Sequence, residues 1–361
     1  MIPALPDFPW DSLAGDRALA AAHPDGIVDL SVGTPVDPIS PGVRAALSGP
    51  AADDPGYPTT HGPASLRQAI AGSLRRRFGV VVDPVAVLPT IGSKELVAWL
   101  PTLLGLGAGD TVVIPELAYP TYEVGGRLAR TEVLRADSTA ALGPRRIGLL
   151  WVNSPSNPTG RVLPPEHLRK VVDWARERGT VVASDECYLS LSDGATSILH
   201  PEVCGGSADG LLAVHSMSKS SGLAGYRAGF VTGDPALVAS LLEVRKHAGM
   251  IVPRPVQAAM AAAAADDEHV GAQAAAYAAR RVRLRAALES SGMTVEHSGA
   301  GLYLWATDGR ACREVVHDLA ALGILVAPGE FYGPTGGRHV RVALTATDER
   351  IDAAVTRLTT P

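Results

Sequence analysis

The stretch between about residues 63 and 232 alternates short, wholly apolar runs with segments of helical periodicity. The apolar runs predict strands at 111–114, 147–152, 180–185, 211–216 and 228–233. The helical segments predict helices over 63–79, 93–105 and 164–179. Strands that are apolar throughout are buried on both faces, and strands joined by helices usually pair in parallel. The alternation therefore predicts an α/β fold, in which helices cover both faces of a mainly parallel sheet.

The pattern changes after residue 234. Ala- and Arg-rich helices are predicted through about 234–247 and 255–290, followed by strands at 301–307 and 339–345, a helix near 311–322 and a final helix. This order is typical of a smaller α+β domain. We therefore expect an N-terminal arm and the start of the small domain at 1–44, a large domain at 45–270 and the small C-terminal domain at 271–361.

Composition excludes several classes of protein. The 361 residues carry 32 basic and 37 acidic side chains and no basic run, so we expect no nucleic-acid partner. The longest apolar run, 258–265, is too short for a membrane span, and the first residues lack the pattern of a signal peptide. Cys187, Cys204 and Cys312 form neither a disulfide framework nor a CxxC pair. We therefore expect a cytoplasmic protein.

Polar clusters follow three of the predicted strands. NSPSNPTG (153–160) follows the strand at 147–152, DECY (185–188) closes the strand at 180–185, and SMSK (216–219) closes the strand at 211–216. In open α/β sheets, ligands bind beyond the carboxyl ends of the strands. The three clusters together therefore predict one binding site.

Three other readings of these motifs do not hold. Ser216-x-x-Lys219 has the spacing of a serine β-lactamase nucleophile, but the SDN and KTG elements of that mechanism are missing. GLGAG (105–109) precedes a strand, whereas a dinucleotide-binding loop follows one. The ten histidines show no metal-ligand spacing, so we expect no metal site.

Lys219 lies among residues with small side chains at the end of a strand. A lysine in such a setting is suited to imine formation with a carbonyl group. A phosphate-bearing aldehyde would explain its neighbours, since Arg227 and Ser216 could bind the phosphate. GSKE (92–95) opens a helix, and free N–H groups at a helix start also bind phosphate.

Two more residues suit an aromatic cofactor. Asp185 could hold a pyridine nitrogen protonated, which makes the ring an electron sink. Tyr119, in ELAYPTY (116–122), could stack on a ring face. With these motifs in order over nearly the whole chain, the sequence resembles the fold-type I, class I/II aminotransferases, which use pyridoxal 5′-phosphate (PLP).

The resemblance implies a role for each cofactor residue. Lys219 forms the imine with PLP and then moves the proton between the substrate Cα and the cofactor. Asp185 pairs with the pyridinium, and Tyr119 stacks on the ring. Asn157 and Tyr188 donate hydrogen bonds to the phenolic oxygen of PLP. The residues implied at the phosphate are Ser93, Lys94 (through backbone amides), Ser216 and Arg227.

The resemblance also implies a partner and a substrate clamp. Tyr57 resembles the tyrosine that reaches the phosphate of a neighbouring subunit, so a homodimer with shared sites is implied. Arg341 resembles the arginine that clamps the substrate α-carboxylate, with Gly33 and Asn157 beside it. The small-molecule partners would be an amino acid and a 2-oxo acid.

Ordinary roles remain open for several of these residues. Tyr57 and Tyr119 are also consistent with core aromatics, and Arg341 with a surface ion pair. Glu95 and Glu186 are expected to be helix-end or solvated carboxylates. Three tryptophans are expected in the core: Trp99, Trp151 and Trp305.

Only the resemblance of particular sequence stretches narrows the choice of substrate. DLSVGTPVDP (29–38), PELAYPTY (115–122), LLAVHSMSKSS (211–221) and VRKHAGMIVPRPVQAAM (244–260) most resemble the short N-succinyldiaminopimelate aminotransferases of high-GC bacteria, which serve lysine and diaminopimelate synthesis. By this resemblance, residues 244–257 would line the substrate tail in the site of the neighbouring subunit. Candidates for binding a distal carboxylate are Arg245, Lys246, His247 and Arg254.

Two further functional classes stay open. The chain is also consistent with an aminotransferase for aspartate, aromatic or alanine-like amino acids, or with a PLP-dependent carbon–sulfur lyase of the same fold. A PLP-sensing regulator is disfavoured, because no helix-turn-helix segment precedes residue 30.

Overall fold

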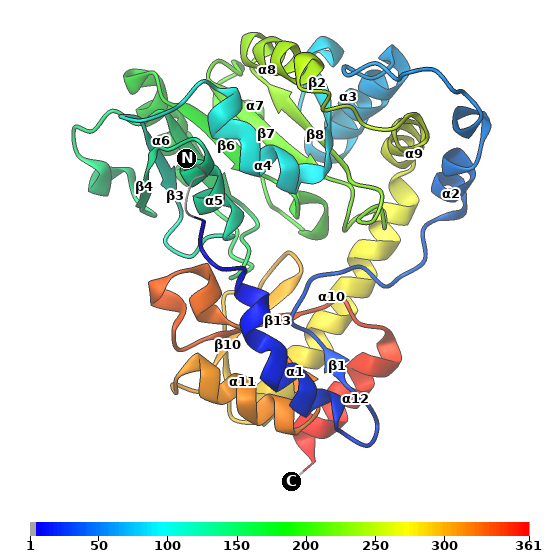
Figure 1. Ribbon diagram of the computed structural model, residues 1–361, viewed down its shortest axis with the longest axis vertical. Coiled ribbons are helices and arrows are strands. Elements are labelled where there is room, and N and C mark those ends of the chain that lie inside the picture. The colour runs from blue at the N-terminus through cyan, green and yellow to red at the C-terminus, as the bar shows by residue number, and fades with distance from the viewer. Residues whose placement is uncertain (1–4, 361) are drawn as a thin grey trace.

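The computed structural model describes residues 5–360, which form two groups of elements (Figure 1). The larger group is built on a seven-stranded sheet with the order β2-β8-β7-β6-β5-β3-β4. Its strands are β2 (Val87–Ile91), β3 (Thr111–Ile114), β4 (Glu132–Arg135), β5 (Leu149–Asn153), β6 (Val181–Asp185), β7 (Leu211–Ser216) and β8 (Ala228–Gly233). Within this sheet only β8 runs against the others. The mainly parallel sheet is confirmed.

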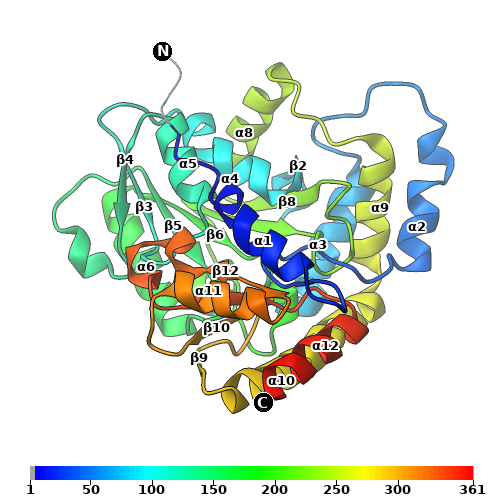
Figure 2. The same ribbon diagram turned by 60° about the horizontal axis from the view of Figure 1, so that its bottom comes forward.

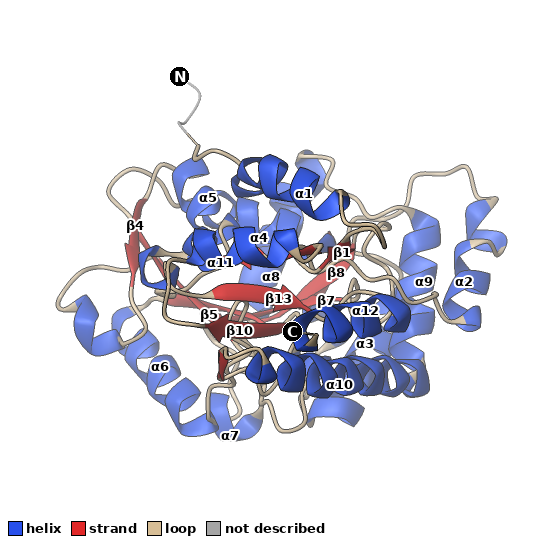
Figure 3. Ribbon diagram, turned by 90° about the horizontal axis from the view of Figure 1, so that it is seen from below, coloured by secondary structure: helices blue, strands red, loops and turns tan. Residues whose placement is uncertain are grey.

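Helices cover both faces of this sheet, as Figure 3 shows. Along β5, Leu150 and Val152 pack against one set of helices, while Leu149 and Trp151 pack against the other. The alternation of side chains along a strand explains this division. The first set is α3 (Ala64–Phe78), α6 (Pro165–Arg178) and α9 (Arg254–Ala265), and the second is α4 (Gly92–Leu103), α5 (Thr121–Leu128) and α8 (Pro235–His247). Two shorter helices, α2 (Pro41–Leu47) and α7 (Pro201–Cys204), complete the group.

The smaller group joins both ends of the chain. Its antiparallel sheet has the order β12-β13-β10-β9, with β9 (Thr294–Glu296), β10 (Tyr303–Thr307), β12 (Ala327–Pro328) and β13 (Val340–Ala343). The pair β1 (Val28–Asp29) and β11 (Ile324–Leu325) lies beside it. Its helices are α1 (Ala14–Ala21), α10 (Asp267–Ser290), α11 (Cys312–Ala321) and α12 (Asp348–Thr359), with α12 lying along α10 in Figures 1 and 2. The expected α+β character of this part is confirmed.

Hydrophobic packing indicates where the chain passes between the groups. Leu13, Val28 and Leu30 belong to the cluster of the smaller group, whereas Val43 belongs to that of the larger one. At the other crossing, α9 packs in the larger group and α10 in the smaller. We propose domain boundaries within residues 31–43 and near the start of α10. Among the described residues, none of the helices has the length and apolar character that a membrane crossing requires.

One helix predicted from the sequence is two separate helices in the structure. The Ala-rich pattern predicts a continuous helix over 255–290, but the structure breaks it at Asp266 between α9 and α10. The Asp266 carboxylate accepts hydrogen bonds from the backbone N–H groups of Glu268 and His269, at 3.0 and 3.3 Å. This side chain therefore begins a new helix as its N-cap.

A charge network around the buried Arg280 ties the N-terminal arm to two C-terminal helices. The guanidinium of Arg280 on α10 donates to both carboxylate oxygens of Asp37, at 2.6 and 2.8 Å, and to Asp348 on α12 at 3.2 Å. The Arg280 side chain is 3% exposed. Its hydrogen bonds hold the pKa of Asp37 below its usual range. Because the partners lie far apart in the sequence, this network fixes the arm on the smaller group.

We predict that Arg280→Met lowers the free energy of unfolding by about 2 kcal/mol, because the Asp37 carboxylate would be left half-buried without its partner. Urea denaturation measures the change. Arg283→Met is the matched control on the same helix. Its ion pairs with Asp348 and Asp352 are exposed, so a loss under about 1 kcal/mol is expected. Equal losses in the two variants would contradict this account.

Candidate active site

A cavity of about 360 Å³ lies at the carboxyl ends of β6 and β7, between the two groups of elements. Residues from the N-terminal arm, from the start of α4 and from β13 also line it. It brings together every residue predicted for the site except Tyr57. Those residues are Gly33, Ser93, Lys94, Tyr119, Asn157, Asp185, Tyr188, Ser216, Lys219, Arg227 and Arg341.

Lys219 reaches the middle of this site. Its ammonium donates a hydrogen bond to the carbonyl oxygen of Gly33 in the N-terminal arm. Burial lowers the pKa of Lys219, which favours the neutral, nucleophilic amine. Gly33 is required by space, since a Cβ there would collide with the ring and hydroxyl of Tyr303.

Asp185 is a buried carboxylate with two fixed hydrogen bonds. The hydroxyl of Tyr122 donates to Oδ2 at 2.7 Å, and the backbone N–H of Cys187 donates to Oδ1 at 3.2 Å. Burial raises the pKa of Asp185, and within residues 5–360 it makes no ion pair. A cationic group in the cavity would therefore be stabilised beside it.

Tyr122 was not predicted as a site residue. It is fully buried, and its ring stacks on Trp151 at 4.9 Å between centroids. Tyr119 meets it edge to face at 5.9 Å. The available signal was its position in PELAYPTY, three residues after Tyr119 and at the start of α5.

The loop after β5 connects these groups. Asn153 donates from Nδ2 to the carbonyl oxygen of Asp185 at 2.9 Å and accepts from the backbone N–H of Asn157 at 2.8 Å. The Asn157 side-chain oxygen then accepts from Arg341 at 3.0 Å. Asn153 therefore holds both Asp185 and Asn157 in place, although the sequence had not singled it out.

Arg341 is a buried cation, not a surface ion pair. The residue is 2% exposed, and its guanidinium donates to Asn157 Oδ1 and, at 2.6 Å, to the carbonyl oxygen of Ser31. It lies 3.9 Å from the ring centroid of Tyr303, and its Nε has no partner. In the described chain no carboxylate pairs with it. Such a buried charge is ready to bind an anionic group.

A second cationic region lies at the start of α4. That helix has no side-chain cap, so its first N–H groups are free to bind an anion. Arg227, with the left-handed φ of 59°, directs its guanidinium to Gly92, where a Cβ would lie 2.5 Å from Nη2. Burial, and then the charge of Arg227, lower the pKa of Lys94. A bound phosphate would relieve this repulsion.

Three residues at the outer wall of the cavity, on its solvent side, were not predicted as site residues. Phe8, Trp10 and Arg17 of the N-terminal segment line the cavity. The Lys94 ammonium lies 5.7 Å from the ring centroid of Phe8 and 5.8 Å from that of Tyr119. Arg17 pairs with Asp29 at 2.8 Å on the exposed side. The opening therefore combines aromatic rings with two cations.

Arg245 is wrong as a candidate for binding a distal carboxylate. Its side chain is fully buried, and its guanidinium donates to both carboxylate oxygens of Glu95, at 2.8 and 3.1 Å. The Glu95 carboxylate also accepts from the backbone N–H of Ile91 at 3.2 Å. The pair therefore fixes the first turn of α4, and Glu95 is a helix-end carboxylate with a buried partner.

The other residues outside the cavity lie on the surface. Tyr57 is 96% exposed, so it is not a core aromatic. Arg254 pairs with Asp54 at 3.0 Å and donates to the carbonyl oxygens of Gly56 and Tyr57. Lys246 pairs with Glu243 on the same helix. His247 is exposed at the end of α8.

The predicted burial of two other residues was also wrong. Glu186 is buried rather than solvated, and burial raises its pKa to about 7 while Ile198 N–H donates to it at 2.7 Å. Trp99 is 39% exposed, whereas Trp151 and Trp305 are core residues as expected. Within residues 5–360, no group of His, Cys, Asp and Glu side chains could hold a metal ion.

The arrangement of donors fits PLP. Uncapped helix N–H groups and two repelling cations suit a phosphate, and a buried carboxylate without a cation suits a pyridinium. A lysine of lowered pKa lies in the same cavity, ready for an aldehyde. Arg341 remains free for a substrate carboxylate.

Comparisons with known proteins agree with this fit. The profile of the family described as "Aminotransferase class I and II" matches residues 25–358. A "probable aminotransferase" of Mycobacterium tuberculosis is 64% identical, over 99% of this chain and 86% of that protein. The 4-dedimethylamino-4-oxo-anhydrotetracycline transaminase OxyQ of Streptomyces rimosus is 57% identical, over 98% and 99%.

A solved structure shows the same fold. The structure of a "probable N-succinyldiaminopimelate aminotransferase" from Thermus thermophilus superposes with a TM-score of 0.86 at 27% identity, covering 98% of this chain and 99% of that one. The chain therefore belongs to the class I and II aminotransferases, the fold-type I family whose cofactor is PLP.

Proposed function

We propose that this aminotransferase acts on N-succinyl-LL-2,6-diaminopimelate, with 2-oxoglutarate as the amino acceptor. The observation that carries the proposal is the buried guanidinium of Arg341, which has no carboxylate partner in the described chain and suits the α-carboxylate of either substrate. Both substrates also have a remote carboxylate. Arg17, from the N-terminal segment that lines the cavity, supplies a cation for it. The sequence resemblance and the Thermus thermophilus structure support the same substrate.

PLP, when bound, supplies a protonated ring that withdraws electrons from the substrate Cα. Lys219 then holds and moves the proton at that carbon, and the Asp185 carboxylate, fixed by Tyr122, keeps the ring nitrogen protonated. Asn157 and Tyr188 orient the ring through its phenolic oxygen. Ser93, Lys94, Ser216 and Arg227 bind the phosphate, while Arg341 orients the substrate by its carboxylate.

A second candidate substrate class is an aromatic ketone or its amine. Phe8 and Trp10 offer rings at the opening of the cavity. OxyQ, by its name, acts on 4-dedimethylamino-4-oxo-anhydrotetracycline. Aromatic rings stack on aromatic side chains. The panel of substrates below separates the two candidates.

We predict that Lys219→Ala abolishes transamination, with a loss of at least about 10³-fold, because covalent attachment and proton transfer are lost together. Glutamate-dependent turnover measures the loss. Treatment with borohydride followed by mass spectrometry should add the cofactor to the wild type but not to the variant. Lys170→Ala, on the exposed side of α6, is the control and should behave as the wild type. Near-native turnover of Lys219→Ala would contradict the assignment.

We predict that Arg341→Lys lowers kcat/KM for every α-amino acid, which corresponds to a loss of about 2–4 kcal/mol in transition-state stabilisation. The reason is that lysine lacks the planar fork that binds a carboxylate through two hydrogen bonds. Arg338→Lys, three residues earlier and exposed, is the control. Alanine, glutamate and N-succinyl-diaminopimelate are compared. An Arg341→Lys loss confined to one of them would contradict a role at the shared carboxylate.

The same panel tests the substrate. N-succinyl-LL-2,6-diaminopimelate should have the highest kcat/KM, and Arg17→Gln should penalise it and glutamate while sparing alanine. A preference for aromatic ketones or amines would favour the second candidate. Formation of a 2-oxo acid without any amino acceptor would instead indicate a carbon–sulfur lyase.

We also propose that the enzyme is a cytoplasmic homodimer in which Tyr57 completes the phosphate site of the partner. The support is its 96% exposure on a loop held by Arg254, away from the cavity of its own chain. We predict that Tyr57→Ala and Lys219→Ala are each poorly active alone. Mixed dimers of the two should regain activity, because one site then has both intact residues. No recovery on co-expression would contradict the shared site.

A further inference from the structure

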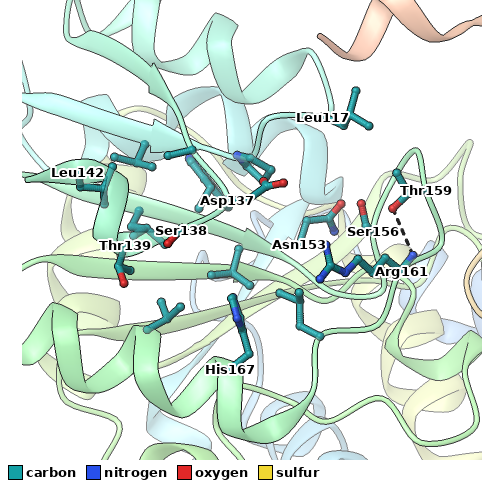
Figure 4. A pocket seen from close by; sticks show the side chains of 18 of the residues that line it. Leu117, Asp137, Ser138, Thr139, Leu142, Asn153, Ser156, Thr159, Arg161 and His167 are labelled. Atoms are coloured by element: carbon teal, nitrogen blue, oxygen red, sulfur yellow. Dashed lines mark hydrogen bonds between the residues drawn. The ribbon is translucent and has the colours of Figure 1, made fainter. Parts of the chain in front are cut away.

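A second cavity, of about 190 Å³, lies on the α6 side of β5 (Figure 4). The ends of β3 and β5, the segment after β4, helix α6 and the loop after β5 surround it. His297, which precedes β10, closes it from the smaller group of elements. The residues assigned above to PLP or to the substrate do not line this cavity. Ser156 and Thr159, from the loop that carries Asn157, do line it.

One end of this cavity is polar. Arg161, His167 and Asp137 come from three different segments, and their side chains point into the space in Figure 4. Arg161 makes no ion pair with any described residue, although its backbone N–H binds Thr159 Oγ1 at 3.3 Å. Asp137 accepts a hydrogen bond from the backbone N–H of Glu116 on Oδ1 at 2.9 Å, which leaves Oδ2. The Arg161 guanidinium and the Asp137 carboxylate therefore face one space from its exposed rim.

His167 adds no charge at neutral pH. Burial, followed by the nearby charge of Arg161, lowers the pKa of its imidazole. The Asp137 carboxylate acts on the same imidazole in the opposite sense, so both charges lie near it. The polar end thus presents Arg161 and Asp137 beside the imidazole, with Lys170 and Glu166 of α6 also near it.

The remainder of the wall is apolar. Leu142 and Leu150 are buried in the core of the larger group, and Leu163 and Val171 pack there beside them. An apolar pocket with a few convergent polar groups is the usual form of a small-molecule site. The ligand that matches it has a carboxylate, an ammonium group and an apolar side chain.

We propose that this cavity binds a free apolar α-amino acid. The carboxylate is held by Arg161, the ammonium group by Asp137, and the side chain lies against Leu142, Leu150 and Val171. Charge-assisted hydrogen bonds at both ends select the zwitterion over a simple acid or amine. The apolar walls exclude charged side chains, because these would be desolvated without a partner.

The position of the cavity places this ligand next to the catalytic centre. Asn153 lines both cavities, and it is the residue that holds Asp185 and Asn157. The loop that leads from it to Arg161 is also clamped by the smaller group, where Ser298 N–H donates to the Thr159 carbonyl at 2.9 Å. The site is therefore distinct from the catalytic one but shares a wall with it.

Calorimetric titration of the holoenzyme with L-leucine tests the proposal. The enzyme is first treated with borohydride, which fixes PLP on Lys219 so that the amino acid cannot exchange with that lysine. Leucine should bind with a stoichiometry of one per chain. Arg161→Gln and Asp137→Asn should each weaken binding about tenfold or more. Arg169→Gln, an exposed arginine on α6, is the matched control and should bind like the wild type.

Three outcomes would overturn the proposal. The first is no binding of leucine, valine or phenylalanine at millimolar concentrations. The second is binding that Arg161→Gln leaves unchanged but Arg341→Lys removes, which would place the ligand in the catalytic cavity. The third is equal affinity for 4-methylpentanoate, which lacks the ammonium group and would leave Asp137 without a role.

Discussion

The buried guanidinium of Arg341 is the interaction on which the site depends. It stands on β13 in the smaller group, donates to Ser31 in the N-terminal arm, and donates to Asn157 in the loop after β5 of the larger group. Three segments that are remote in the sequence therefore meet at one charge. Because a buried charge without hydrogen bonds is strongly unfavourable, the arm and the loop are both held to it. The same contact leaves one nitrogen without a partner in the described chain, where a substrate carboxylate is expected.

The sequence predicted the parts that local patterns encode. Apolar runs such as 211–216 and 228–233 gave strand bounds that match β7 and β8. The carboxyl ends of β6 and β7 meet at one edge of the sheet, so Asp185 and Lys219 could be placed in one site from their positions alone. By contrast, β4 was not predicted, because its residues are only partly buried at the edge of the sheet and lack a continuous apolar run.

Contacts between distant segments could not be predicted in this way. Arg245 was grouped with three other basic residues near the end of a helix, and nothing nearby indicates Glu95, its partner 150 positions earlier. Phe8, Trp10 and Arg17 were missed for the same reason, since only the folded arm brings them to the cavity. Tyr122 could be predicted only in part. Its spacing from Tyr119 is a local pattern, but its hydrogen bond to Asp185 joins distant segments.

The arm also has a practical consequence for anyone who purifies this enzyme. Phe8 and Trp10 line the cavity, so the segment that precedes α1 forms part of its wall. The other end of the chain leaves from α12, at the foot of the smaller group in Figure 1. An enzyme purified without residues 5–13 would therefore lack part of the cavity wall, while it kept every residue assigned to PLP.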